Sequence, residues 1–323
     1  MRYLGPAEIR QALDPLELSE RLRAAFADHA RGRGANSPRL VLPTVGRGAL
    51  GAMLAVSPAD GLVGAKLVSV NPENPARGLN PHQGIVVLLD PDTGEFRAGF
   101  DASEITALRT VALSIAATKA LARADARTLA VFGTGLQAYL HAIAVPRVRS
   151  IEEIRIVGRD PLKTARLQKR LRDHFARIGR SGPAVKVDTN PAEAARAGDV
   201  LCLCTAIAQP YLRFADLRPG AHVNAVGACR PGMREILVSP RDPLAVFVDD
   251  RERAREEAEE IRSYFVGERA DRVVPLGDVF AGTHPGRVGN GARTLFKSVG
   301  VGLQDIVAAG LVLENLARRE KHS

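Results

Sequence analysis

The residues with the clearest chemical meaning are Gly133-Thr134-Gly135-Leu136-Gln137-Ala138, a Gly-x-Gly-x-x-Ala motif that follows a short apolar run and opens a helical pattern. In this setting Gly133 permits a tight turn, Gly135 lets the backbone approach a pyrophosphate, and Ala138 lets helix and strand pack closely. Free N–H groups at the start of the helix attract the anion. We therefore predict that residues 133–137 bind a nicotinamide dinucleotide, the alternative being a glycine turn in some other α/β protein.

The end of the next predicted strand bears on the choice of cofactor. NAD-binding proteins usually carry an acidic residue there, which holds the ribose hydroxyls. In this chain Gly158 takes that position and Arg159 follows it. An arginine can pair with a 2′-phosphate, so the sequence favours NADPH over NADH. Asp160 is a ribose ligand only if the register shifts, and before Pro161 it is better interpreted as a helix cap.

The elements that must position these residues form an alternation of strands and helices from about 125 to 290. Strands are predicted near 128–133, 153–158, 184–189, 199–205, 221–227 and 244–250, with helices near 136–148, 161–178 and 191–198. This alternation predicts a doubly wound parallel sheet with helices on both faces. Cys202 and Cys204 are interpreted as core residues of a buried strand, and no metal site is predicted.

The rest of the chain predicts a second domain. Residues 6–33 have the apolar spacing of one amphipathic helix, and 39–100 alternate short apolar runs with turns, including one at Asp90–Gly94. These runs indicate an antiparallel or mixed sheet. Helices are predicted at 102–123 and at 299–321. The predicted fold class is α/β, with a Rossmann domain at 113–299 and an N-terminal α+β substrate-binding and dimerisation domain at 1–112 plus 300–323, joined by the C-terminal helix.

Composition narrows the possible partners. The chain has 323 residues, enough for two domains, and a formal net charge of +9. Its basic residues are mixed with acids and it has no Trp, so a nucleic-acid partner is not expected. No apolar run reaches the length of a membrane span, and the N-terminus lacks the pattern of a signal peptide. With only three cysteines, we expect a cytoplasmic protein.

Several spaced motifs, at 64–84, 105–123, 132–141, 219–235 and 295–309, together resemble the ornithine cyclodeaminase/mu-crystallin family. The resemblance covers nearly the whole chain and is closest to the mu-crystallin branch. It implies a homodimer in which a dimer-forming sheet domain accompanies a Rossmann domain. It also implies hydride transfer between a nicotinamide and the Cα of an amino or imino acid.

The resemblance implies that Arg39, Lys66 and Arg109 bind the substrate carboxylate. The residue types fit, because a buried carboxylate requires paired cations. Lys66 also stands out by itself, since it interrupts the apolar run GLVGAKLVSV. The pair His82-Gln83 matches a similar pair in the mu-crystallin branch. His82 could donate a proton to a substrate nitrogen or simply hydrogen-bond the ligand. The predicted catalytic residues are Lys66, Arg109 and His82, with Gln83 as a further substrate ligand.

One departure from the family pattern separates the possible activities. Cyclodeaminases carry an Asp in the segment that matches Gly227–Pro231, and in this chain the position falls on Cys229. A carboxylate can accept the proton of the attacking amine, whereas a thiol lacks permanent charge at neutral pH. Cys229 is therefore expected to border the substrate without supplying that base.

The same resemblance implies that Thr110, Thr205, Val226, Ser298 and Val299 line the cofactor. The expected activity is NAD(P)H-dependent reduction of a cyclic imino acid such as Δ1-pyrroline-2-carboxylate or Δ1-piperideine-2-carboxylate. Ornithine cyclodeaminase and amino-acid dehydrogenase are the enzymatic alternatives. A cofactor-binding, crystallin-like protein without catalysis is the alternative from another class.

Overall fold

The computed structural model describes residues 2–321 except 45, 47, 81, 180–181 and 267–270. The chain divides into two compact units, Met1–Leu113 with Val301–Ser323 (unit 1) and Ser114–Gly300 (unit 2). The chain passes from unit 1 to unit 2 inside helix α3 (Ala102–Leu121) and returns after Gly300. The sequence placed the two boundaries after residues 112 and 299, and the structure places them one residue later, after 113 and 300.

Unit 1 is built on a mixed sheet, as the alternation of apolar runs and turns predicted. Its order is β1-β7-β6-β5-β4-β2, with β3 also paired to β4. Strand β1 is parallel to β7, and all other pairs are antiparallel. The strands are β1 (Tyr3–Leu4), β2 (Ala35–Asn36), β3 (Leu40–Pro43), β4 (Ala49–Ser57), β5 (Leu62–Val70), β6 (His82–Leu89) and β7 (Phe96–Asp101).

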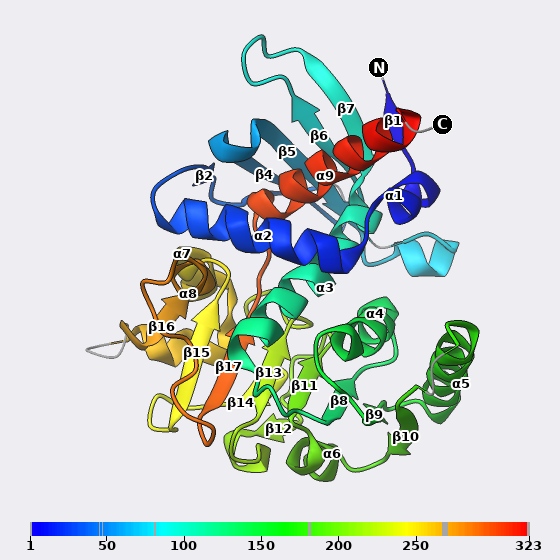
Figure 1. Cartoon of the computed structure of the whole chain (residues 1–323), viewed down its shortest axis with the longest axis vertical. Helices are drawn as coiled ribbons and strands as arrows, with labels where there is room; N and C mark the ends of the chain where they lie inside the picture. Colours follow the sequence, from blue (N-terminus) through cyan, green and yellow to red (C-terminus); the bar gives the residue numbers. More distant parts are fainter. Residues whose placement is uncertain are drawn as a thin grey trace. The chain divides into compact units, whose positions relative to one another are not determined.

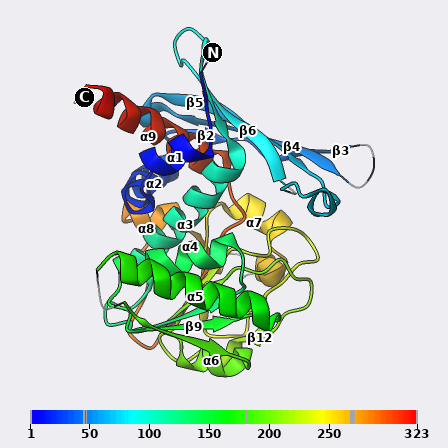
Figure 2. The ribbon, with the colours of Figure 1, turned by 90° about the vertical axis from the view of Figure 1, so that its right-hand side faces the viewer.

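The two faces of this sheet differ in burial. Met53, Lys66 and Val86 lie side by side on β4, β5 and β6, and all three are buried. Helix α9 (Gly302–Glu320) packs on these three strands and α2 (Pro15–Ala30) packs on α9, so both helices lie on one side of the sheet (Figures 1 and 2). The opposite face carries aliphatic side chains that are 36–59% exposed, namely Leu40, Leu42, Leu50, Leu54, Val56 and Leu67. We call this set the outer apolar face.

The prediction of one helix over 6–33 was wrong, because the structure has two helices, α1 (Pro6–Ala12) and α2 (Pro15–Ala30). Proline at position 15 lacks the N–H that a continuous helix requires and disfavours helical backbone at the residue before it. Leu13 and Asp14 are accordingly extended. The Asp14 carboxylate then caps α2 by accepting hydrogen bonds from Leu16 N at 2.6 Å and Glu17 N at 3.3 Å.

Unit 2 has the predicted doubly wound architecture. Its eight-stranded sheet has the order β10-β9-β8-β11-β13-β17-β15-β16, and every pair in it is parallel. The strands are β8 (Thr128–Phe132), β9 (Glu153–Val157), β10 (Ala184–Asp188), β11 (Val200–Leu203), β13 (His222–Ala225), β15 (Leu244–Val248), β16 (Val273–Pro275) and β17 (Arg293–Lys297). A separate parallel pair consists of β12 (Leu212–Arg213) and β14 (Ile236–Leu237).

Alternate residues of each central strand enter different cores. Leu129 and Val131 of β8 pack in one cluster with residues of α4 and α5, whereas Ala130 and Phe132 pack in another with residues of α6. Helices therefore cover both faces of the sheet, and Figure 2 shows α5 and α6 on opposite sides of β9. The helices of unit 2 are α4 (Leu136–Ala144), α5 (Pro161–Arg177), α6 (Pro191–Ala197), α7 (Arg251–Glu257) and α8 (Leu276–Ala281).

The cysteine interpretation is correct for one residue and wrong for the other. Cys202 is fully buried in β11, but this strand ends at Leu203, and Cys204 follows it as a partly exposed residue. Cys204 still packs against the core cluster that contains Cys202. Within the described ranges, no group of three His, Cys, Asp or Glu side chains is arranged to hold a metal ion. No described helix is long and apolar enough to cross a membrane.

Candidate functional site

The glycine loop of unit 2 is shaped to admit an anion. Gly133 has φ +117°, a conformation that L side chains rarely adopt, and a Cβ at this position would lie 2.9 Å from Cys204 O. Gly135 is the N-cap of α4; its carbonyl accepts from Tyr139 N at 3.1 Å, and as a glycine it has no side chain to cap the first N–H groups. A Cβ at Gly135 would meet no atom within 4 Å, so space is open beside the first turn of α4. The N–H groups of a first helical turn have no acceptor within the helix itself, so this turn fits a phosphate.

The remaining residues of the motif support this shape. Ala138 of α4 is fully buried and packs in one cluster with Leu129 and Val131 of β8, as expected for a small residue where helix and strand pack closely. Thr134 and Gln137 are partly exposed, and Leu136 is 52% exposed. The loop also lies where the order of the strands reverses. Strands β9 and β10 lie on one side of β8, and β11 lies on the other. In open α/β sheets, ligands bind at such a switch point, outside the carboxyl ends of the strands.

The end of β9 has little room for an acidic side chain. A Cβ at Gly158 would lie 2.6 Å from Thr134 Cγ2 and 2.5 Å from Thr164 Oγ1. Arg159 is exposed and makes no hydrogen bond or ion pair with any residue that the structure describes. Asp160 is the N-cap of α5, and its carboxylate accepts from Leu162 N at 2.9 Å and Lys163 N at 3.1 Å. The interpretation of Asp160 as a helix cap is confirmed, which leaves Arg159 as the charged group at this edge.

Thr205 and Val226 follow β11 and β13 at the same edge of the sheet. The backbone ladder continues into both segments, because Cys204 N donates to Phe132 O at 2.9 Å and Val226 N donates to Leu203 O at 3.0 Å. Thr205 is further held by the buried carboxylate of Glu235, which accepts from Thr205 N at 2.6 Å and from Thr205 Oγ1 at 2.7 Å. The two predicted cofactor positions are thus rigidly placed.

Ser298 and Val299 follow β17, and the buried carboxylate of Asp249 organises them. This carboxylate accepts from Ser298 Oγ at 2.7 Å, from Val299 N at 3.0 Å and from Gly300 N at 2.7 Å. Gly300 has φ +83°, which fits glycine at the point where the chain leaves unit 2. Asp249 therefore fixes the segment that was expected to lie near the nicotinamide.

Cys229 acts as a hydrogen-bond donor in the structure. Its thiol donates to Val226 O at 3.1 Å and to Ser298 O at 3.7 Å. These two carbonyls belong to the segments that follow β13 and β17, so Cys229 connects two predicted cofactor-lining segments. The thiol is partly exposed and is not in a disulfide.

A second polar cluster lies inside unit 1, around the carboxylate of Asp305 in the first turn of α9. Lys66 Nζ lies 3.0 Å from Asp305 Oδ1 and 2.9 Å from Asp305 Oδ2, and it also lies 3.3 Å from Thr106 Oγ1. Arg109 Nε donates to Asp305 Oδ1 at 3.2 Å, and Arg109 Nη1 donates to Gln304 Oε1. All of these side chains except Thr106 are at least nine-tenths buried. We call Lys66, Arg109, Gln304 and Asp305 the carboxylate-binding cluster, after the Asp305 carboxylate that its two cations hold.

The electrostatics of this cluster favour an incoming anion. Two cations share one carboxylate, and the charge of Arg39 also acts on Lys66. Burial is the largest cause that lowers the pKa of Lys66, and the charges of Arg109 and Arg39 act in the same direction. Asp305 opposes them, and the net result is a pKa of about 8. A second carboxylate, brought by a ligand, would balance the excess positive charge. A lysine with this pKa can also exchange its proton near neutral pH.

The structure does not gather all the predicted substrate residues. Arg39 lies directly before β3 and is partly exposed, close enough for its charge to act on Lys66. His82 and Gln83 begin β6 and are exposed, and Gln83 Nε2 donates to Asn80 O at 3.2 Å. Because strand residues alternate, His82 shares the sheet face of Val86 and Lys66, four positions away, whereas Gln83 belongs to the opposite face. Thr110 lies in α3 beside Arg109, and its hydroxyl donates to Thr106 O at 2.7 Å.

Sequence reasoning missed the buried acids that hold these residues. Asp305, Asp249 and Glu235 are each less than 5% exposed, and each accepts several hydrogen bonds from predicted site residues. A signal was present for Asp305, since it is the one acid among the apolar residues of VGVGLQDIVAAG. No comparable local signal marked Asp249 or Glu235, because Asp249 comes directly after the strand β15, where an acid can simply end the apolar run, and Glu235 follows the loop residues Pro231–Arg234.

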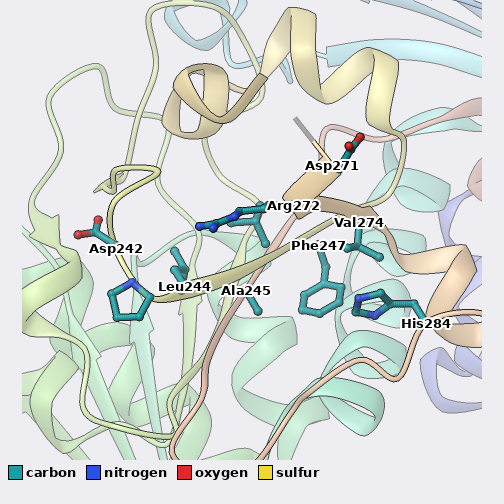
Figure 3. A pocket seen from close by; sticks show the side chains of 10 residues that line it. Asp242, Leu244, Ala245, Phe247, Asp271, Arg272, Val274 and His284 are labelled. Atoms are coloured by element: carbon teal, nitrogen blue, oxygen red, sulfur yellow. The ribbon is translucent and has the colours of Figure 1, made fainter. Parts of the chain in front are cut away.

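Unit 2 also has an open pocket whose lining residues include none of the predicted cofactor-binding residues. Its volume is about 410 Å³, and Figure 3 shows side chains of the β15 and β16 region around it, including Asp242, Phe247, Arg272 and His284. Part of its lining is Asp242–Ala245, which lies at the amino end of β15. The glycine loop follows the carboxyl end of β8, so the pocket and the loop belong to opposite edges of the parallel sheet.

Comparison with known proteins places this geometry in context. The model of the ornithine cyclodeaminase/mu-crystallin family matches residues 5–320. The ketimine reductase mu-crystallin of Mus musculus is 34% identical over 298 residues, which cover 91% of this chain and 90% of the relative.

Two solved structures share the fold over nearly the whole chain. The Δ1-pyrroline-2-carboxylate reductase of Thermococcus litoralis, in complex with NADH and L-proline, has a TM-score of 0.90 and 27% identity, and the match covers 99% of this chain and 98% of that one. An archaeal alanine dehydrogenase dimer with bound NAD also has a TM-score of 0.90, with 29% identity, covering 99% and 97% of the two chains.

Proposed function

The chain belongs to the ornithine cyclodeaminase/mu-crystallin family, and we propose that it is an NAD(P)H-dependent reductase of cyclic imino acids. Its substrates would be of the Δ1-pyrroline-2-carboxylate or Δ1-piperideine-2-carboxylate type. The observation that carries this proposal is the carboxylate-binding cluster, in which buried Lys66 and Arg109 share the carboxylate of Asp305. The names of the relatives, a ketimine reductase and a pyrroline-2-carboxylate reductase, agree with this substrate class.

In the proposed reaction, unit 1 supplies the groups that bind and protonate the imine. Arg109, held by Asp305 and Gln304, presents its remaining N–H groups to the substrate carboxylate. A dinucleotide held by unit 2 would supply the hydride for the C=N carbon. Lys66 donates the proton that the ring nitrogen acquires in this reduction and recovers it from solvent, a role that suits its pKa of about 8.

The groups of unit 2 support binding of a nicotinamide dinucleotide, and we propose that NADPH is preferred. The open first turn of α4 receives the pyrophosphate, as the space beside Gly135 supports. The crowding at Gly158 disfavours the acidic residue that would select NAD, while Arg159 is available to a 2′-phosphate. The relatives with NADH and NAD in their descriptions make NADH the alternative.

Ornithine cyclodeamination is the less favoured activity. That reaction needs a base beside the attacking amine, and the family places it at the position of Cys229 in this chain. The Cys229 thiol instead donates to Val226 O, the nearer of two carbonyl acceptors, so it is occupied as a donor. Reduction of a preformed cyclic imine needs no such base.

We also propose that the active form is a homodimer built on the outer apolar face. Leu40, Leu54 and Leu67 on this face are 59%, 56% and 43% exposed. A contiguous apolar sheet face of this kind commonly marks a protein interface. A second copy of this chain is the proposed occupant, in keeping with the dimer described for the alanine dehydrogenase relative.

The activity is tested by following NADPH and NADH oxidation with each cyclic imine, and NAD⁺-dependent conversion of ornithine to proline in parallel. We expect turnover of at least one imine, and we expect Lys66→Ala to lose most of this activity while retaining cofactor binding. Conversion of ornithine without turnover of either imine would refute the reductase proposal. A Lys66→Ala variant with unchanged activity would remove Lys66 from the reaction.

A further inference from the structure

The carboxylate of Glu235 lies beneath two segments that carry predicted cofactor residues, and it is fully buried. Its Oε1 accepts from Thr205 N at 2.6 Å, from Thr205 Oγ1 at 2.7 Å and from Tyr211 Oη at 3.2 Å. Its Oε2 accepts from Gly227 N at 2.9 Å and from Ala228 N at 3.2 Å. One side chain thereby joins the segment after β11 to the segment after β13.

Two further contacts extend this network to the neighbouring strands. Tyr211, which donates to Glu235, stacks on Phe132 with ring centroids 5.6 Å apart, and Phe132 is the last residue before Gly133. On the other side, Lys297 donates to Ala228 O and lies 3.2 Å from Glu260 Oε1. Lys297 is the last residue of β17, directly before Ser298.

The donors around Glu235 support an ionised carboxylate. Burial and the nearby charge of Glu260 raise the pKa of Glu235, while Lys297 and the hydrogen bonds of Thr205 oppose that rise. Three of the five donors are backbone N–H groups, which can only donate. Both oxygens of Glu235 must therefore act as acceptors, a requirement that a carboxylate meets and an amide does not.

We infer that Glu235 is the positioning residue that sets the geometry of the cofactor-binding edge of unit 2, because its carboxylate fixes the segments that carry Thr205 and Val226. This inference rests on the proposed function, which assigns those segments to the dinucleotide. Glu235 itself makes its contacts through backbone and side-chain groups of these segments, so its effect on the dinucleotide is indirect.

The substitution Glu235→Gln isolates this role, because it preserves shape and removes one acceptor. With the amide nitrogen toward Thr205, the donor Thr205 N faces another donor. With the amide reversed, Gly227 N and Ala228 N both face a donor. Either arrangement displaces at least one segment, since a buried N–H without an acceptor is costly. We expect NADPH to bind about tenfold more weakly, as one such mismatch predicts.

The matched control is Glu259→Gln, which changes an acid that also accepts from a backbone group, Gly232 N at 3.2 Å, and from Arg234. It lies outside the two segments and should leave cofactor affinity unchanged. Tyr211→Phe is a milder variant that removes one donor to Glu235 and keeps the ring on Phe132. We expect it to weaken NADPH binding by about threefold, as loss of one neutral hydrogen bond predicts.

The experiment measures the dissociation constant of NADPH by fluorescence titration, together with thermal unfolding and, for the reductase assay, kcat and KM for each reactant. A positioning role predicts weaker NADPH binding at temperatures where Glu235→Gln is fully folded, with a KM for the imine close to that of the wild type. Unchanged NADPH affinity in folded Glu235→Gln would overturn the inference, and if that variant does not fold, unchanged affinity in Tyr211→Phe would do so. A wild-type protein that binds neither NADPH nor NADH would instead refute the proposed function.

Discussion

The substitution Asp305→Asn removes the charge that the carboxylate-binding cluster shares and keeps its shape. In the structure, Asp305 lies 2.9–3.0 Å from Lys66 Nζ and accepts from Arg109 Nε. Of the groups that act on Lys66, Asp305 is the one that favours its charged form. The variant therefore leaves a buried lysine beside the cations Arg109 and Arg39 with no carboxylate to balance them.

The size of the effect follows from the cost of an unbalanced buried charge. Removing one partner of a buried ion pair costs about 3–5 kcal/mol if the other stays charged. Since about 1.4 kcal/mol corresponds to one pKa unit, Lys66 would release its proton instead, and its pKa would fall by about two units or more. Starting from about 8 in the wild type, the pKa in the variant is expected near 6 or below.

The protonation state of Lys66 sets the direction of the pH dependence. A lysine that donates a proton is active below its pKa and inactive above it, so wild-type kcat/KM should fall as pH rises through about 8. At pH 7, about nine-tenths of wild-type Lys66 is protonated, compared with about one-tenth in Asp305→Asn. We therefore expect kcat/KM of the variant to be about tenfold lower at pH 7 and to recover as pH falls below 6.

The assay is the pH profile of kcat/KM for imine reduction, which reports groups of the free enzyme. Glu314→Gln, on the same helix, is the matched control, because its half-buried carboxylate pairs only with Arg21 and Arg318 among the ion pairs of the described chain. Its profile should match that of the wild type. An Asp305→Asn profile with its decline still near pH 8 would refute the assignment of Lys66 as the proton donor coupled to Asp305.

Three further substitutions test the rest of the site. Arg159→Ala should raise the dissociation constant of NADPH about 10- to 100-fold, because a charge-assisted pair is lost. The dissociation constant of NADH is the internal control and should not change. Equal effects on both cofactors would argue against a 2′-phosphate contact. Gly133→Ala should lower the unfolding free energy by about 1–3 kcal/mol and weaken cofactor binding. The reason is that Gly133 has φ +117° and an added Cβ would crowd Cys204 O. An unaltered chemical denaturation curve would contradict this prediction. Leu54→Asp should convert the dimer to a monomer in size-exclusion chromatography with light scattering, and a persistent dimer would place the interface elsewhere.

Much of the fold could be predicted from the sequence because its signals are local. The alternation of apolar strands and amphipathic helices predicted the parallel sheet of unit 2, and the glycine at 133 predicted the turn that follows β8. The division of 6–33 into α1 and α2 was missed, although Pro15 carried the signal. A helical period continues across such a break in the sequence, so periodicity by itself did not reveal where the backbone becomes extended.

For the site, the sequence by itself determined which residues could serve. Lys66 was conspicuous because a lysine within an apolar strand is poorly explained by packing, and Arg159 because it follows the position of the usual acid. Only the tertiary structure decided what holds them. Asp305 reaches Lys66 across 239 residues of chain and Arg109 across 196. Contacts at such separations depend on how the C-terminal helix packs on the sheet, and no local pattern of residues specifies that packing.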